Sequence, residues 1–361
     1  MNILVIALSG IGDALMFTPS LEKLNEEIPS ADIDVLVMYN GVKDIFEKLP
    51  HISKIRYFDF LNSSKLSSIA YVLKLRKKYD VTINVYPSNR KEYNLISWLI
   101  GAKYRLAIIY LRKDFFNLGF LNNIRIKEND KLHNVEENIL LCEKLTKFPS
   151  KKISSMQLNL RADDFDFAKK FLDEKEIDDN NLVIGFHPGC SSMKNHDKRR
   201  WEPAKFAELG KKLISEHKAK ILIFGGGEEE SLKDIIIAKM DTGNVYSVET
   251  LSLTNTAAVM KRCNLFITND SSLMHIAAAL KLNVIVILGP TNKNYIFPWK
   301  TIYSISSLNL ECSPCFYYSP KPLTCSRKDL KFKCIKNLTV QMVYEKAQLQ
   351  IKAHPNPSRL A

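Results

Sequence analysis

The feature that most constrains the fold is an alternation of short apolar segments, rich in β-branched residues, with longer amphipathic segments. Continuous apolar runs favour strands buried on both faces, and helical periodicity between them favours a parallel sheet covered by helices. In the first half, the pattern predicts strands at Asn2–Leu8, Asp32–Met38 and Val81–Val85 and helices at Ala14–Glu27 and Lys65–Lys78. We therefore expect a doubly wound α/β domain.

The same rhythm begins again near residue 180. The predicted strands are Leu182–Phe186, Lys220–Phe224, Leu265–Thr268 and Val284–Leu288, and the predicted helices are Pro203–Glu216, Ser231–Met240 and Leu273–Leu280. A chain of 361 residues is long for one core. We expect domains at 1–165 and 166–335, then a C-terminal helix and a frayed tail at 336–361. Ligands bind beyond the carboxyl ends of strands in such sheets, so we expect the site in a cleft between the domains.

The first polar segment follows the first predicted strand and reads Ser9-Gly10-Ile11-Gly12-Asp13. Two glycines permit a tight turn and a close approach by substrate. The third glycine of a dinucleotide fingerprint is missing, which argues against a nicotinamide cofactor. Asp13 stands at the helix start and is expected to face the cleft. The competing interpretation is a helix cap, a position that aspartate favours.

Three more polar segments lie in the second half. One is His187-Pro188-Gly189-Cys190-Ser191-Ser192, whose small residues and hydroxyls suit phosphate oxygens. Another is Lys198-Arg199-Arg200-Trp201, whose cations suit a diphosphate. The third is Gly225-Gly226-Gly227 followed by three glutamates, where a carboxylate can accept hydrogen bonds from ribose hydroxyls. A solvated basic loop and a flexible acidic turn are the competing interpretations.

A further segment opens a predicted helix and reads Thr268-Asn269-Asp270-Ser271-Ser272-Leu273-Met274-His275. The amide groups of a helix N-terminus bind anions, and the two serines add hydroxyl donors. Gly289-Pro290-Thr291 follows the next strand and would border the same pocket. The competing interpretation is a capped helix with a packed histidine.

In this order, the segments resemble glycosyltransferase family 9, the lipopolysaccharide heptosyltransferase family, from residue 1 to about residue 345. The matching residues are Gly12-Asp13 with Thr18-Pro19, His187-Pro188-Gly189, Arg199-Arg200-Trp201, Asn269-Asp270-Ser271 with His275, and Gly289-Pro290-Thr291. Weaker matches are Gly101-Ala102-Lys103-Tyr104-Arg105 and His133-Asn134-Val135. The resemblance implies an α/β protein with the GT-B fold, in which two Rossmann-like, doubly wound domains face a central cleft.

The resemblance also implies the reaction, an inverting and metal-independent transfer of a sugar from a nucleotide diphosphate to an acceptor hydroxyl. Family habit favours a heptose from ADP-heptose and a lipopolysaccharide-core-like or other glycan acceptor. Asp13 would be the base on that hydroxyl, with Gly12, Arg105 and His133 on the acceptor side. The donor-binding residues would be Ser191, Ser192, Arg199, Glu228, Glu229, Asp270, Ser271, Ser272 and His275. Attack at an anomeric carbon needs such a base and charge stabilisation on the departing phosphate.

Two residues depart from the family pattern. Arg199 stands where the family usually has lysine, which keeps the charge and adds bidentate reach. Ser272 stands where the family usually has glycine, and a Cβ at this position crowds a diphosphate.

Four of the seven cysteines, Cys312, Cys315, Cys325 and Cys334, form a separate cluster. Two close thiols with two more distant ones have the spacing of a structural metal site, for zinc or iron. Packed free thiols and disulfides in an oxidised sample are the competing interpretations. The family resemblance adds that some relatives hold iron in a similar segment. No cofactor is expected to be required for catalysis.

The formal net charge of +13 favours anionic partners. No RNA-binding or helix-turn-helix signature accompanies it, so nucleic acid is not an expected partner. The basic helix Lys65–Lys78 and the apolar-basic stretch Leu95–Phe120 are candidates for contact with anionic lipid, although such stretches more often pack on the sheet. The opening MNILVIALSG is expected to be a strand and not a signal peptide. We therefore expect a cytoplasmic protein, peripheral to the inner face of the membrane.

Two other functions fit the same architecture. A nucleotide-sugar epimerase would release a new sugar isomer without any acceptor. A non-enzymatic binder of nucleotide sugars would bind donor and be indifferent to changes at Asp13.

Overall fold

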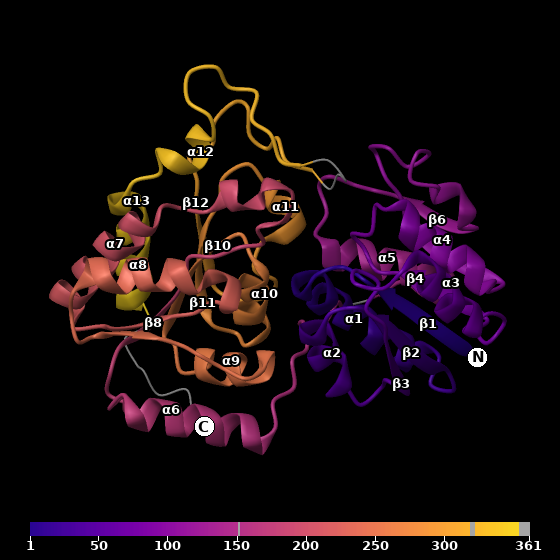
Figure 1. Cartoon of the computed structure of the whole chain (residues 1–361), viewed down its shortest axis with the longest axis horizontal. Helices are drawn as coiled ribbons and strands as arrows, with labels where there is room; N and C mark the ends of the chain where they lie inside the picture. Colours follow the sequence, from indigo (N-terminus) through magenta and orange to yellow (C-terminus); the bar gives the residue numbers. More distant parts are fainter. Residues whose placement is uncertain (151, 318–321, 354–361) are drawn as a thin grey trace. The chain divides into compact units, whose positions relative to one another are not determined.

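The structure is a computed structural model that describes residues 1–150, 152–317 and 322–353. The chain divides into two compact units, the first comprising Met1–Asn159 and the second beginning at Leu160 (Figure 1). The division falls after Asn159 and not after residue 165, because helix α6 (Ala162–Glu174) packs on α9 (Leu253–Met260) of the second unit. Each unit is a parallel sheet with helices, as the alternating pattern predicts.

The sheet of the first unit has the strand order β3-β2-β1-β4-β5-β6. Its strands are β1 (Asn2–Ala7), β2 (Asp32–Val37), β3 (Lys54–Tyr57), β4 (Val81–Asn84), β5 (Tyr104–Ile109) and β6 (Ile124–Lys127). Neighbouring strands are parallel, with Ile3 opposite Ile33 of β2 on one side and Val81 of β4 on the other. The order therefore reverses direction between β1 and β4, and such a switch point is where open α/β sheets bind ligands.

The helices of the first unit connect these strands. They are α1 (Ile11–Glu27), α2 (Asn40–Glu47), α3 (Lys65–Lys74), α4 (Lys91–Ile100), the 3-10 turn η1 (Gly119–Leu121) and α5 (Asn134–Thr146). Helix α3 ends earlier than expected, because Lys77 has φ +59°, outside the helical range. Apolar residues of α3 and α4, among them Val72 and Ile96, pack on Leu4 and Ile6 of β1.

The sheet of the second unit repeats this topology, with the order β12-β11-β10-β7-β8-β9. Its strands are β7 (Val183–His187), β8 (Lys220–Ile223), β9 (Val245–Ser247), β10 (Leu265–Asn269), β11 (Asn283–Ile287) and β12 (Tyr303–Ser306). The three central strands β7, β10 and β11 are completely buried. The switch point here lies between β7 and β10, which pair in parallel.

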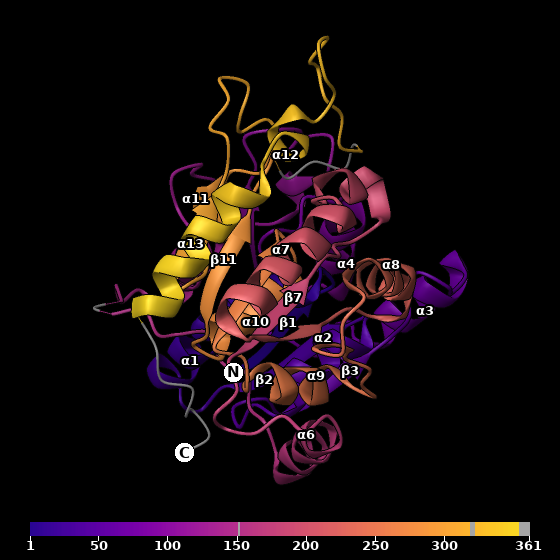
Figure 2. The ribbon, with the colours of Figure 1, turned by 90° about the vertical axis from the view of Figure 1, so that its left-hand side faces the viewer.

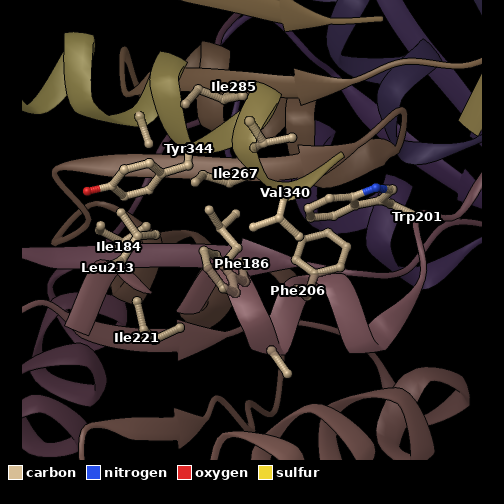
Figure 3. Close-up of a cluster of buried hydrophobic side chains, with 14 of the residues drawn as sticks. Ile184, Phe186, Trp201, Phe206, Leu213, Ile221, Ile267, Ile285, Val340 and Tyr344 are labelled. Atoms are coloured by element: carbon tan, nitrogen blue, oxygen red, sulfur yellow. The ribbon is translucent and has the colours of Figure 1, made fainter. Parts of the chain in front are cut away.

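The helices and turns of the second unit are α6, η2 (Met193–Arg199), α7 (Pro203–His217), η3 (Gly227–Glu229), α8 (Glu230–Met240), α9, α10 (Ser272–Ala279), α11 (Lys293–Ile296), α12 (Lys333–Lys336) and α13 (Val340–Ala353). The C-terminal helix α13 lies beside α7 (Figure 2). Its residues Val340 and Tyr344 share a buried cluster with Trp201 and Phe206 (Figure 3). Helix α13 is therefore part of the second unit's core.

No helix among the residues that the structure describes is long and apolar enough to cross a membrane.

Candidate functional site

The polar segments of the second unit meet at its switch point. His187 is the last residue of β7, Asn269 is the last residue of β10, and the two strands are neighbours in the sheet. The Asn269 side chain joins two of the segments, since it donates a hydrogen bond to Pro188 O at 2.6 Å and accepts one from Trp201 N at 3.0 Å. Segments that are 81 residues apart in sequence are thus held at one edge of the sheet.

A buried histidine bridges this switch point. His187 Nδ1 lies 2.8 Å from Ser271 Oγ, and Nε2 lies 3.1 Å from Glu229 Oε2. Because an ionised carboxylate can only accept, the ring donates from Nε2 to Glu229, while Nδ1 pairs with the Ser271 hydroxyl. His187 thereby couples the orientation of the glutamate after β8 to that of the serine after β10.

Glu229 is held as an ionised acceptor. Burial alone would raise its pKa, but the hydrogen bond and charge of His187 and a hydrogen bond from Gly226 N, at 3.1 Å, lower the pKa overall. Gly189 leaves room for this carboxylate, because a Cβ there would lie 1.7 Å from Glu229 Oε1. The neighbouring Glu228 is exposed and accepts from Ser192 Oγ at 3.3 Å. The structure thus separates the two glutamates that the sequence left equivalent.

A second, charged cluster surrounds Asp270. Its Oδ2 accepts from Arg199 Nη1 at 2.5 Å and from Thr291 Oγ1 at 2.6 Å. The Arg199 guanidinium carbon also lies 5.3 Å from the centre of the Phe316 ring. Arg199 Nε is buried and has no hydrogen-bond partner among the described residues. The guanidinium is therefore fixed on one side by Asp270, while its hydrogen-bonding capacity is not used up.

The N-terminus of α10 lies between these clusters. Ser271 is the N-cap residue, but its hydroxyl makes no capping hydrogen bond and contacts His187 and Thr268 instead. Ser272 is the first helical residue. The first backbone N–H groups of a helix lack intrahelical partners, so this end of α10 can bind an anion.

The remaining expected donor residues lie in two different environments. Ser191 and Ser192 are exposed, and Ser191 Oγ accepts from Met193 N at 3.3 Å. His275 is buried, and its Nδ1 has no hydrogen-bond partner among the described residues. Burial lowers the pKa of His275 to about 4, so the ring is neutral near pH 7 and offers a hydrogen bond and not a charge.

In the first unit, Asp13 lies at the switch point between β1 and β4. It is the third residue of α1, it is half-buried, and its Oδ2 accepts from Gly10 N at 3.1 Å. Ser9 Oγ donates to Pro87 O at 2.7 Å and ties the loop after β1 to the loop after β4. Asp13 therefore does cap α1, beside Gly12, and also stands at the edge where ligands bind such sheets.

The other two acceptor-side candidates have structural contacts. His133 is the N-cap of α5, is fully buried, and accepts from Val135 N at Nδ1 over 3.1 Å. Arg105 donates to Leu121 O at 2.9 Å and to Ala102 O at 2.7 Å. Arg105 is opposite Thr82 in the sheet, near the amino ends of the strands. The structure does not bring Arg105 to Asp13, because Asp13 follows the carboxyl end of β1.

The clustered cysteines lie close enough for their thiols to shift one another's pKa. Burial first, and then the charges of Cys315, Cys325 and Cys312, raise the pKa of Cys334 to about 11. All seven cysteines are free, so the disulfide alternative does not apply to this structure. Within the described ranges, no group of three His, Cys, Asp or Glu side chains is arranged to hold a metal ion.

Four residues of this site were not among the individually predicted site residues: His187, Gly189, Thr291 and Phe316. The first three stand in segments that match the family pattern, and that was the available signal. Phe316 carries no such signal, because its contact with Arg199 depends on the path of the chain after β12.

The sequence of this chain is similar to those of known heptosyltransferases. The profile of glycosyltransferase family 9 (heptosyltransferase) matches residues 70–323. The lipooligosaccharide heptosyltransferase 2 of Campylobacter jejuni is 26% identical over 359 residues, which cover 98% of this chain and 99% of that protein.

Solved structures share the fold. The ADP-heptose lipopolysaccharide heptosyltransferase II of Escherichia coli aligns with a TM-score of 0.75 at 20% identity, over 98% of this chain and 100% of that one. The iron-containing dodecameric glycosyltransferase TibC of enterotoxigenic E. coli aligns with a TM-score of 0.57 at 12% identity, over 97% of this chain and 78% of that one. The two doubly wound units are thus those of the GT-B fold.

Proposed function

The chain belongs to glycosyltransferase family 9, and from this premise we propose that it transfers a heptose from ADP-heptose to a hydroxyl of a lipopolysaccharide-core acceptor. The family makes the chain a glycosyltransferase. The choice of heptose, ADP and acceptor follows the relatives, which are described as lipooligosaccharide and lipopolysaccharide heptosyltransferases. The solved E. coli structure is described as an ADP-heptose lipopolysaccharide heptosyltransferase.

The observation that carries the donor part is the bridge from Glu229 through His187 to Ser271. A ribose diphosphate needs an ionised acceptor for its hydroxyls and, a few ångströms away, an anion site for its phosphates. Glu229 is such an acceptor, and the start of α10 with Ser271 and Ser272 is such an anion site. We assign the ribose to Glu229 and the diphosphate to this helix end.

Arg199 would stabilise the leaving group. As the bond between the anomeric carbon and the phosphate oxygen breaks, its electron pair stays on the diphosphate, and negative charge grows there. A buried guanidinium stabilises that charge more strongly than an exposed one, because the local dielectric constant is low. Ser191 and Ser192 are exposed hydroxyl donors that follow β7 in the chain and would complete the phosphate contacts.

Asp13 would be the general base. Its carboxylate would take the proton of the acceptor hydroxyl while the hydroxyl oxygen forms the new bond to the anomeric carbon, on the face opposite the diphosphate. This displacement inverts the anomeric configuration and needs no metal. The support for it is the position of Asp13 at the switch point of the first unit, as the third residue of α1 after β1.

One variant tests this role. Asp13→Asn keeps the size and the capping oxygen, so the fold should persist, while the loss of a general base lowers turnover by about 10²–10⁴-fold. ADP affinity measured by calorimetry should stay near wild type. Glu26→Gln, an exposed change on the same helix, is the matched control and should leave turnover unchanged. An Asp13→Asn enzyme with more than about a third of wild-type turnover would show that Asp13 is only a cap.

A second experiment tests the donor. A ligand that binds only the folded state raises its melting temperature by mass action. We expect ADP-heptose to stabilise the chain more than UDP-, GDP- or CDP-sugars at equal concentration. Equal shifts with all four nucleotides, or none with ADP-heptose, would reject the proposed donor.

We also propose that Cys312, Cys315, Cys325 and Cys334 can hold a structural zinc or iron ion. Four thiols within electrostatic range of one another are a suitable donor set, and TibC is described as iron-containing. Binding would require the four thiols to move closer together, since no three of these groups are arranged to hold an ion among the described residues. The transfer reaction proceeds through no step at this cluster.

Finally, we propose that the enzyme acts at the inner face of the membrane, as a peripheral protein of the cytoplasm. The support is the lipid-linked nature of lipopolysaccharide, the acceptor named for its relatives.

A further inference from the structure

The first unit carries a layer of exposed apolar side chains on the outer side of α3, α4 and η1. Helix α3 contacts α4 (Figure 1), and α4 contacts η1, so the three form one continuous layer. Its exposed apolar residues are Leu66, Ile69 and Leu73 of α3, Leu95 and Trp98 of α4, and Leu111, Phe115, Phe116 and Phe120 around η1. We call this layer the α3–α4 face.

The exposure on this face is high. Leu66 is 81% exposed, Phe115 is 73% exposed and Phe116 is 79% exposed. Leu66, Ile69 and Leu73 have helical spacing and form one stripe, while Val72 and Leu75 point into the core. The rings of Phe115 and Phe116 lie 6.2 Å apart, and Phe115 and Phe120 lie 5.5 Å apart. Single exposed apolar residues need no explanation, but a connected layer of them indicates an interaction surface.

The positive charge of the chain is concentrated on the same segment. Residues 61–120 contain eleven Lys and Arg against three Asp and Glu, a net charge of +8, whereas the whole chain has +13. Residues 1–60 contain five basic against nine acidic residues, a net charge of −4. The exposed cations of the segment are Lys65, Lys74, Arg76, Lys77, Lys78, Lys91, Lys103, Arg112 and Lys113. One of its three acids, Asp114, is already paired with Arg125 at 3.3 Å.

We propose that the α3–α4 face docks the first unit on an anionic lipid bilayer. Exposed Leu, Trp and Phe side chains enter the boundary between headgroups and acyl chains, while lysines and arginines contact the anionic headgroups. The many basic residues of this face favour a bilayer over a protein partner, because the centres of protein interfaces are depleted in charged residues, lysine included. The aliphatic residues Leu66, Ile69 and Leu73 argue against nucleic acid as the partner, because they offer no ring on which bases stack.

The inference deepens the proposed function, because it names the surface that would bring the enzyme to a lipid-linked acceptor. Only the biological role of lipid binding rests on the proposed function; the binding itself does not. Lipid binding is measured on the whole chain without donor or acceptor, so failure of one proposal is distinguishable from failure of the other.

The test is co-sedimentation of the full chain with vesicles. Wild type should bind vesicles of phosphatidylethanolamine and phosphatidylglycerol and should not bind phosphatidylcholine vesicles. The affinity of the variant Phe115→Ser/Phe116→Ser for these vesicles should be at least about ten-fold lower than that of wild type. Lys77→Glu/Lys78→Glu should lower the affinity for anionic vesicles by about thirty-fold. Added salt should weaken the binding of wild type to the same vesicles. The matched controls on the second unit, Leu251→Ser and Lys170→Glu/Lys211→Glu, should bind as wild type.

Trp98 supplies an independent readout. It is half-exposed, whereas the other two tryptophans, Trp201 and Trp299, are buried. Its emission should shift to the blue on anionic vesicles, and Trp98→Phe should abolish the shift without loss of fold.

The melting temperature of every face variant, measured without nucleotide, should stay near that of wild type and so confirm that the fold is intact. The proposal is overturned if wild type does not bind anionic vesicles, if the face variants bind as well as the controls, or if the face variants lose single-stranded RNA binding and not vesicle binding.

Discussion

The pair Arg199–Asp270 gives the sharpest prediction about the donor site. Both side chains are nearly buried, and the Nη1–Oδ2 distance is 2.5 Å. Arg199→Ala leaves the Asp270 carboxylate hydrogen-bonded to the Thr291 hydroxyl, at 2.6 Å, but without its cationic partner. A buried charge that loses its ionic partner costs about 3–5 kcal/mol of folding free energy. The loss of a charge-assisted contact to the diphosphate costs about 1.5–3 kcal/mol of binding, or about 10- to 150-fold in Kd.

The two losses can be separated. In Arg199→Ala/Asp270→Asn the unpaired charge is gone, so we expect urea denaturation to show that most of the folding free energy returns. ADP affinity, measured by calorimetry well below the melting temperature, should stay low, because the cation that binds the phosphate is still missing. If the double variant binds ADP as wild type does, Arg199 acts only by holding Asp270, and the reasoning about the leaving group is wrong.

Three further predictions concern single residues. Gly189→Ala should displace the Glu229 carboxylate, because the new Cβ would lie 1.7 Å from Oε1. Calorimetry should then show an ADP affinity at least about ten-fold lower than that of wild type. Burial raises the pKa of Glu137 from 4.5 to about 7. Between these two pH values the unfolded chain has released a proton that the folded chain still holds. The free energy of unfolding of wild type therefore falls as the pH rises through this range. Glu137→Gln should therefore gain up to about 3 kcal/mol relative to wild type at pH 8 and little at pH 4.5, as followed by thermal unfolding. Cys325→Ser should lower the zinc or iron content of freshly reduced protein and its melting temperature; elemental analysis that finds no metal in wild type would leave the thiols as packing.

The central strands were predictable because they are continuous apolar runs. β1, β7, β10 and β11 are buried along nearly their whole length, and buried parallel strands need such runs on both faces. Strands nearer the edges, such as β3 and β12, are short and partly exposed, so their apolar residues do not stand out. Their existence follows from pairing with a neighbouring strand, which the local sequence does not record.

The sequence indicated which segments meet at the candidate site, but not which of their side chains are in contact. Because parallel strands end at a common edge, polar segments after β7, β8 and β10 were expected to meet, and they do. Which side chains touch depends on register and rotamers. The bridge through His187 could therefore not be derived from sequence, nor could the choice between Glu228 and Glu229. The position of Arg105 near the amino end of β5 could not be derived for a related reason, because a match in the right unit says nothing about which end of a strand a residue occupies.

The most direct test of the account is the transfer itself. The full chain is mixed with ADP-heptose and lipopolysaccharide that lacks its heptoses, and the acceptor is weighed by mass spectrometry while released ADP is counted. We predict that each acceptor gains the mass of one heptose for each ADP released, with the anomeric configuration inverted in the NMR spectrum of the product. Donor consumption without any gain in acceptor mass, or release of an isomeric free sugar, would contradict the account.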